Sequence, residues 1–379
     1  MEIVHLVFGK QNKSAFSLAI AVDQLATEQV RLGYNVKLWE ISPISNDDFQ
    51  QRPYKTYLFN VKSFLWNTTQ EINQAIDKLK KGTIVHMHGG FIPVYFTLAY
   101  HLKRKNIPFV YTTHGTYNKL FIQSAGIAKK IYFHLFENLL IKWSSAMHFV
   151  SNDEQFGLQA SYPIDQAKMV FIPNGLSNGN KLVPPKIKKN EEPIFCFMGQ
   201  LDIHEKGLDI LLNAFAQYKH KYFEKGVLWI IGEGAGKENL YKLAIQLNIQ
   251  QSVFFKPTVY GVLKFELLNK VDVFLRPSRS EYFPSAILEA ASTSVPSIVS
   301  KETNMGNYIN EYKAGYTMEE NTAGNLSRLM ITCLRDIKNF NWDSKRRNAY
   351  KMVNEKFQWN KIAQQHITVY EKVLDQIAA

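Results

Sequence analysis

The chain of 379 residues has only two cysteines, Cys196 and Cys333, which lie far apart in apolar surroundings. We therefore expect two reduced, buried thiols rather than a disulfide. Cysteine and histidine do not cluster at metal-ligand spacing, so the sequence predicts no metal centre. No run of 18 or more apolar residues occurs, which argues against a membrane-spanning helix. The first residues, EIVHLVF, are too short for a secretion signal and lack its basic start, so we expect a cytoplasmic protein.

Acidic residues are also scarce, with 33 Asp and Glu against 45 Lys and Arg, which gives a net charge of +12. The excess is concentrated between Lys81 and Lys142, a segment that contains eight basic residues and one acidic residue, Glu137. Such a surface can attract phosphate-rich ligands, nucleic acid or anionic lipid. A solvated face without a partner explains any single lysine equally well.

Short apolar runs alternate with helical patterns, which predicts parallel sheets flanked by helices, the α/β class. In the first half the expected strands are Glu2–Phe8, Asn35–Ile41, Thr56–Val61, Thr83–Met87, Phe109–Thr112, Ala146–Val150 and Met169–Ile172. Their nearly continuous apolar content is typical of strands buried on both faces. Between the first two strands we expect a helix over Ser14–Leu32, which ends at Gly33.

A polar stretch from Leu176 to Pro193 has no periodicity and predicts a linker. We therefore expect one Rossmann-like domain over 1–178, joined by a C-terminal crossing helix over 359–379, and a second over 190–358. The strands expected in the second domain are Ile194–Met198, Val227–Ile231, Val253–Phe255, Val271–Leu275 and Ser297–Val299. Two such domains in tandem would face each other across a cleft, where ligands bind beyond the carboxyl ends of the strands.

Two glycine-containing segments follow strands of the second domain. In the first, Gly199 and Gln200 end a strand, and Lys206 stands immediately before an amphipathic helix. Helix N-termini favour anions and a lysine adds a full charge, so this segment is a candidate phosphate site. In the second, Gly232 opens a glycine-rich turn that only loosely resembles a dinucleotide fingerprint, and a simple tight turn is at least an equal alternative.

The segment from Pro277 to Ala291 is the most informative one. Pro284 predicts a helix start near Ser285, which leaves Glu281 in the loop and Glu289 just over one turn inside the helix. Ionised carboxylates accept hydrogen bonds from hydroxyls, so two of them suit a polyhydroxyl ligand such as a sugar or ribose.

In the first domain, His114 and Gly115 come directly after a strand, on the expected rim of the cleft. His86 and His88 take a similar place after an earlier strand, and there we favour plain packing at the strand end.

Together these segments resemble the retaining GT-B glycosyltransferases of the family 4 type, with its E-x7-E motif. The similar segments run through nearly the whole chain: Leu32-Gly33-Tyr34-Asn35-Val36, Thr113-His114-Gly115, Ile172-Pro173-Asn174-Gly175, Gly199 to Gly207, Ile231-Gly232-Glu233-Gly234, Glu281 to Ala290, and Phe357 to Ala363. The resemblance implies two Rossmann-like domains, with the last helix returning to the first domain.

The resemblance also implies roles for individual residues. Lys206 would bind the donor diphosphate, and Glu289 would hold the ribose hydroxyls. Glu281 and the backbone around Phe283 and Ser285 would hold the sugar and phosphate. His114 would touch the transferred sugar, so that His114 and Glu281 are the candidate catalytic residues. The remaining candidate donor-binding residues are Gly199, Gln200, Gly232 and Arg279.

Where the family has an arginine beside the first glycine, this chain has Gln200. Such a change forfeits a charge-assisted hydrogen bond, often ~1.5–3 kcal/mol. Arg279 and Lys256 are the candidates to supply the missing positive charge.

The function implied is retaining transfer of a hexose-type sugar from a UDP- or GDP-linked donor to a saccharide or lipid-linked acceptor, in surface polysaccharide or glycolipid synthesis. No cofactor, no catalytic metal and no nucleic-acid partner are expected. Two alternatives remain open, namely a nucleotide-sugar 2-epimerase and a nucleotide-sugar-binding paralogue without activity, which Gln200 would favour.

A last expectation concerns the membrane. Lys103-Arg104-Lys105 and Lys129-Lys130 are followed by a segment rich in apolar and aromatic residues up to Trp143. Basic segments of this kind can dock on the anionic inner face of a cell membrane. Packing of the apolar residues against the first domain's sheet is the competing explanation.

Overall fold

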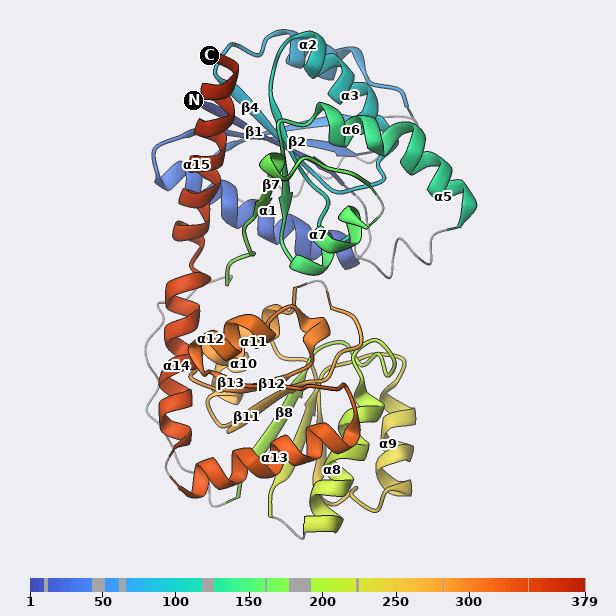
Figure 1. Ribbon diagram of the computed structural model, residues 1–379, viewed down its shortest axis with the longest axis vertical. Helices are drawn as coiled ribbons and strands as arrows, with labels where there is room; N and C mark the ends of the chain where they lie inside the picture. The colour runs from blue at the N-terminus through green and yellow to red at the C-terminus, as the bar shows by residue number, and fades with distance from the viewer. Residues whose placement is uncertain are drawn as a thin grey trace. The chain divides into compact units, whose positions relative to one another are not determined.

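The computed structural model describes residues 1–9, 13–42, 52–60, 66–117, 126–160, 162–176, 192–222, 225–281, 283–339 and 341–378 (Figure 1). The chain forms two compact units. Unit 1 comprises Met1–Ser177 and Gln358–Ala379, and unit 2 comprises Asn178–Phe357.

Unit 1 is built on a parallel seven-stranded sheet with the order β3-β2-β1-β4-β5-β6-β7. Its strands are β1 (Glu2–Phe8), β2 (Asn35–Ser42), β3 (Lys55–Asn60), β4 (Thr83–His88), β5 (Phe109–Thr112), β6 (Ala146–Phe149) and β7 (Met169–Phe171). The strand order reverses between β1 and β4, which is the topological switch point of a doubly wound sheet.

Helices cover both faces of this sheet, as its strands' apolar content requires. They are α1 (Lys13–Arg31), α2 (Gln70–Asp77), α3 (Pro93–Arg104), α5 (Ile127–Tyr132), the π-helix η1 (Phe133–Glu137), α6 (Asn138–Trp143), α7 (Asn152–Gln159) and α15 (Trp359–Ala378). One face packs against α2, α3 and α6 through residues such as Leu6, Met87 and Tyr111. The other face packs against α1 and α15, so the C-terminal helix belongs to the core of the first unit (Figure 1).

Unit 2 repeats the plan with a parallel six-stranded sheet of order β10-β9-β8-β11-β12-β13. Its strands are β8 (Ile194–Met198), β9 (Val227–Ile231), β10 (Val253–Lys256), β11 (Val273–Arg276), β12 (Ser297–Val299) and β13 (Gly315–Thr317). Its helices are α8 (Leu208–Tyr222), α9 (Lys237–Gln246), α10 (Gly261–Leu268), α11 (Ser285–Ser292), α12 (Gly306–Tyr312), α13 (Ala323–Lys338) and α14 (Trp342–Lys356). The switch point here lies between β8 and β11, so residues just beyond these two strands share one edge of the sheet.

The predicted fold class is confirmed, since both halves are α/β units with doubly wound parallel sheets. The three-residue strand β13 escaped sequence analysis because it begins at a glycine and is too short for a periodicity. Cys196 and Cys333 are free and buried, as expected. No helix within the described part of the chain is long and apolar enough to cross a bilayer.

Candidate functional site

Two glycines follow strands at the carboxyl edge of the unit 2 sheet, beside the switch point. Gly199 follows β8 with φ +154°, and Gly232 follows β9 with φ +150°. A Cβ on Gly232 would lie 1.9 Å from the carbonyl oxygen of Gly199, and one on Gly199 would lie 2.7 Å from Nη1 of Arg276. These glycines therefore allow two turns and an arginine to pack at distances that no side chain would permit.

Arg276 ends β11 and is the central cation of this edge. It is 4% exposed, and its Nη1 donates to the carbonyl of Met198 at 2.9 Å. Its Nε and Nη2 lie 2.9 and 2.8 Å from Oε2 of Glu281. The guanidinium also stands 5.0 Å from the ring centroid of Phe197. The arginine thus joins β8, β11 and the loop that carries Glu281.

Glu281 is the shared partner of two cations. Its Oε1 accepts from Nζ of Lys206 at 3.0 Å, and its Oε2 accepts from Ser278 at 2.8 Å. Burial alone would raise the pKa of Glu281, but the charges of Arg276 and Lys206 outweigh it and hold the pKa below its usual value. The backbone carbonyl of Glu281 accepts from Asn304 at 3.0 Å. The carboxylate therefore stays ionised between two cations.

Lys206 lies two residues before the first residue of α8, close to the place that the sequence predicts. The residue after it, Gly207, has φ +64°, and a Cβ there would lie 1.9 Å from the carbonyl oxygen of Pro277. This contact brings the N-terminus of the 15-residue α8 close to the end of β11. Besides Glu281, Nζ of Lys206 contacts Oε1 of Glu205 at 2.6 Å. A buried ammonium, a buried guanidinium and a helix N-terminus therefore lie around one sheet edge, which is an arrangement that binds anions.

Gln200 is exposed next to this group. The two expected replacements for the missing arginine have other partners. Arg279 forms a bidentate pair with Asp209, at 2.8 and 2.6 Å, and Nζ of Lys256 lies 4.5 Å from the ring centroid of Trp229. The cation beside Gly199 is instead Arg276, which sequence analysis missed. Its only signal was a charged residue at the end of an apolar strand.

Glu289 lies in α11, the helix that begins at Ser285 as predicted. Its Oε1 accepts from Nζ of Lys264 at 2.7 Å, and both side chains are partly exposed. Ser285 is exposed at the first position of the helix. Phe283 is partly buried against Phe357, with ring centroids 6.2 Å apart. The segment thus offers a carboxylate and a helix N-terminus on one element.

In unit 1, His114 follows β5 with φ +50°, a conformation that L-residues with side chains rarely adopt. Glu154 holds this turn, because its Oε1 accepts from Thr113 and from the backbone N–H of Gly115, the latter at 2.6 Å. Burial raises the pKa of Glu154 to about 7. This buried carboxyl group lies on α7 and was also missed by sequence analysis.

Behind His114 the interior of unit 1 is rich in histidine. His88 Nδ1 lies 3.0 Å from Nε2 of His114, and His5 lies beyond His88. His5, His86 and His88 bring ring nitrogens within 4.8 Å of one another, the spacing of a metal site. Each of these nitrogens already has a hydrogen-bond partner, so these residues fit a hydrogen-bonded network better than a metal.

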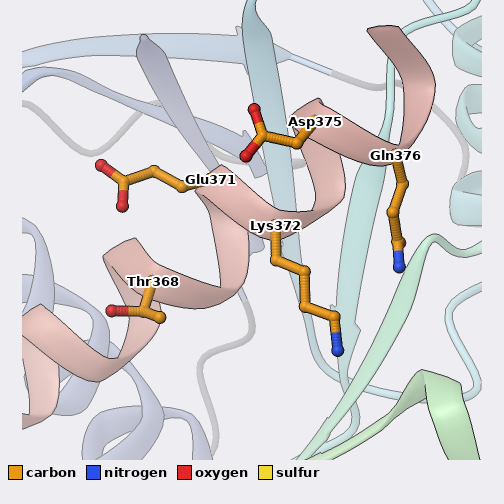
Figure 2. Close-up of a pocket in the computed structure, with 5 residues that line it drawn as sticks. All are labelled: Thr368, Glu371, Lys372, Asp375 and Gln376. Carbon is orange, nitrogen blue, oxygen red and sulfur yellow. The ribbon is translucent and has the colours of Figure 1, made fainter. Parts of the chain in front are cut away.

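A shallow pocket of ≈ 570 Å³ lies on α15 and is unrelated to these groups (Figure 2). All its lining residues belong to that one helix: Thr368, Glu371, Lys372, Asp375 and Gln376. Figure 2 shows the two carboxylates on one side of the helix and the amine and amide on the other. We assign it no ligand, because one helix surface does not enclose a molecule.

Comparison with known proteins matches both halves of the chain to glycosyltransferase families. Residues 180–351 match the family described as glycosyl transferases group 1, and residues 18–177 match glycosyltransferase family 4. An uncharacterized glycosyltransferase of Methanocaldococcus jannaschii is 26% identical over 49% of this chain and 47% of its own. The chain thus spans about half of that relative. A UDP-Gal:alpha-D-GlcNAc-diphosphoundecaprenol alpha-1,3-galactosyltransferase of Escherichia coli is 26% identical over 68% of each chain.

Solved structures share the fold over nearly the full length. A glycosyltransferase from Rickettsia africae superposes with a TM-score of 0.75 at 18% identity, covering 98% of both chains. Anabaena HepE in complex with UDP and glucose superposes with a TM-score of 0.71 at 15% identity, covering 98% of this chain and 100% of the other.

Proposed function

The chain is a glycosyltransferase of the GT-B fold, matched over both halves by group 1 and family 4, and we propose that it moves a hexose-type sugar from a nucleoside diphosphate sugar to a saccharide or lipid-linked acceptor. The reaction serves the synthesis of surface polysaccharide or glycolipid. The observation that carries this proposal is the cation pair, Lys206 and Arg276, at the switch point of unit 2.

The diphosphate is the group that this edge fits. Glu281 offsets only one of the two buried cations, and Glu205, which also contacts Lys206, is exposed and screened by solvent. A diphosphate that replaces Glu205 beside Lys206 would also meet the N-terminus of α8, which favours an anion. Arg276 supplies the positive charge that Gln200 lacks. Gly199 and Gly232 let the two turns and Arg276 pack closely, which holds the guanidinium beside the end of β8.

The nucleoside and the sugar are assigned to neighbouring groups. Glu289 accepts hydrogen bonds from the ribose hydroxyls, and Lys264 neutralises it when no ligand is bound. His114 contacts the transferred sugar, in agreement with its tightly held turn. The backbone of Phe283 and Ser285 supplies donors at the start of α11.

Transfer proceeds with retention of configuration. The bond between the anomeric carbon and the diphosphate breaks, and the acceptor oxygen bonds to that carbon on the same face. The acceptor's proton passes to an oxygen of the leaving diphosphate. Lys206, Arg276 and the α8 N-terminus offset the negative charge that develops there, so that a metal is not needed.

Membrane docking through α5 and η1 is part of the proposal. Ile127, Ile131 and Leu135 are 78%, 53% and 56% exposed, and their spacing of four residues places them on one side of the helix. Lys130 is exposed beside them. The Escherichia coli relative is named for a diphosphoundecaprenol acceptor, which is a lipid. An apolar row flanked by cations suits an anionic bilayer surface.

Two experiments test these assignments. Pure protein is incubated with a panel of UDP- and GDP-sugars, with and without an acceptor lipid extract. Transfer requires the acceptor, an epimerase would convert the donor alone, and a binding protein would do neither. Separately, the wild type should sediment with phosphatidylglycerol vesicles at low salt. High salt or the substitution Ile131→Glu should abolish this sedimentation. Protein that stays in the supernatant at low salt would contradict membrane docking and point to a soluble acceptor.

A further inference from the structure

A line of hydrogen-bonded side chains connects α1 to His114 through the interior of unit 1. Oε1 of Gln29 lies 2.7 Å from Nε2 of His5, and Nδ1 of His5 lies 2.9 Å from Nε2 of His88. Nδ1 of His88 then lies 3.0 Å from Nε2 of His114. His5 and Gln29 are fully buried and His88 is 2% exposed. The line therefore runs where no solvent can exchange partners.

These histidines are neutral at physiological pH. Burial lowers the pKa of His5 to about 4 and that of His114 to about 3, and burial also lowers the pKa of His88 well below its usual value. A neutral imidazole has one N–H and one lone pair, so each contact between two rings needs a donor and an acceptor. The direction of one hydrogen bond in the line consequently determines all the others.

A second line on the same face of the sheet ends on the main chain. His148 Nε2 lies 2.8 Å from the carbonyl oxygen of Ile172, and its Nδ1 lies 2.7 Å from Oγ1 of Thr112. Thr112 lies 2.6 Å from Nε2 of His86, whose Nδ1 lies 2.6 Å from the hydroxyl of Tyr370.

The direction of this second line follows from its end. A carbonyl oxygen only accepts, so His148 donates from Nε2 and its Nδ1 accepts from Thr112. Thr112 has a single hydrogen and must accept from Nε2 of His86. Nδ1 of His86 then accepts from Tyr370, which leaves the oxygen of Tyr370 as an acceptor for a further donor.

The side chain of Gln29 lies near both lines, since it contacts His5 and influences the pKa of Tyr370. Its amide nitrogen is buried and makes no hydrogen bond of ordinary geometry within the described residues. Burial raises the pKa of Tyr370, and the Gln29 amide acts in the opposite direction, as a donor beside that oxygen does. The amide oxygen faces Nε2 of His5 at 2.7 Å, and this contact anchors the first line.

We propose that Gln29, acting through His5 and His88, fixes His114 in the tautomer that carries its proton on Nε2. The amide oxygen of Gln29 accepts from Nε2 of His5, so Nδ1 of His5 accepts from His88. Nδ1 of His88 in turn accepts from Nε2 of His114. Nδ1 of His114 is then the atom with the lone pair.

This tautomer gives His114 a defined chemistry. A lone pair on Nδ1 accepts a hydrogen bond from a hydroxyl group, whereas the opposite tautomer would present an N–H. If His114 contacts the transferred sugar, which rests on the proposed function, the ligand is a sugar hydroxyl that donates. Gln29, His5 and His88 are positioning residues in this account, because they act on the ligand only through His114.

Nitrogen NMR of protein labelled with ¹⁵N-histidine tests the tautomer directly, since the two ring nitrogens of each tautomer have distinct shifts. The His114 signals are identified by their loss in His114→Asn. In the wild type we expect one tautomer, protonated on Nε2. In Gln29→Met, which removes the anchoring oxygen at similar volume, we expect both tautomers in comparable amounts.

His366→Phe is the matched control. This histidine is equally buried and packs on the network through ring contacts with His86 and His148, at 5.6 and 4.6 Å. It should leave the His114 tautomer unchanged. A wild-type His114 protonated on Nδ1 would overturn the proposal even if Gln29→Met failed to fold, and so would an unchanged tautomer in a folded Gln29→Met. If the wild type transfers sugar, Gln29→Met should lower kcat several-fold with donor KM unchanged, whereas absence of transfer would refute the proposed function alone.

Discussion

Replacement of Arg276 by methionine removes the cation at the switch point of unit 2 at nearly constant volume. Breaking a buried ion pair by removing one partner typically destabilises a protein by about 3–5 kcal/mol. Here Lys206 remains 3.0 Å from Glu281, so the carboxylate keeps one cation. The carbonyl of Met198 loses its donor, which adds an effect of about 1–3 kcal/mol that is not fully additive. We therefore expect the free energy of unfolding of unit 2 to fall by about 4 kcal/mol.

Arg279, three residues further along, provides the matched control. Its pair with Asp209 is bidentate, but the two side chains are 32% and 38% exposed. Exposed pairs are screened by solvent and contribute up to about 1 kcal/mol. Hydrogen exchange by mass spectrometry on β8 and β11 measures both variants. Similar losses in Arg276→Met and Arg279→Met, or a loss below ~1 kcal/mol in the former, would refute the placement of Arg276 as the buried cation.

Three further predictions concern ligand, metal and pH. Glu289→Ala should weaken UDP or GDP binding at least tenfold in calorimetry, because the ribose hydroxyls lose their acceptor; unchanged affinity would remove Glu289 from the site. EDTA should leave the transfer rate unchanged, and a complete loss restored by divalent metal would contradict the metal-free account. Unit 1 should lose stability as the pH falls from 7 to 5. The pKa of His5 and of His148 is about 4 in the folded state, against 6.5 in the unfolded state. As the pH falls, the unfolded chain therefore binds protons before the folded chain does. Each of the two histidines then lowers the free energy of unfolding by about 2 kcal/mol at pH 5. Burial raises the pKa of Glu137 and of Glu154 to about 7, so these two groups stabilise unit 1 as the pH falls. The buried histidines outnumber them, so the net effect is a loss of stability. Urea unfolding with hydrogen exchange in β1 and β4 reports the sum, and equal or greater stability at pH 5 would show that these histidines are not buried neutral.

Sequence reasoning located the parts of the site that depend on local pattern. Lys206 before α8 and Ser285 at the start of α11 were predicted because each lies at a boundary between a turn and a helical periodicity. The strands Glu2–Phe8 and Ile194–Met198 were predicted to the residue, since nearly continuous apolar runs mark strands buried on both faces.

Residues whose role depends on distant partners were not predictable. Arg276 contacts Met198, which is 78 residues away, and only the pairing of β11 with β8 brings them together. His5 and His88 are 83 residues apart and meet because β1 and β4 are neighbours at the switch point. Strand order and register decide such contacts, and neither can be derived from local periodicity.

Calorimetric titration of UDP, GDP, uridine and guanosine into the wild type and Lys206→Ala tests the central claim most directly. If the cations of unit 2 bind a diphosphate, one of the two diphosphates binds the wild type and its affinity falls at least tenfold in the variant, while the weak affinity of its nucleoside is unchanged. Equal losses for the nucleoside and its diphosphate, or no binding of either diphosphate to the wild type, would contradict the account.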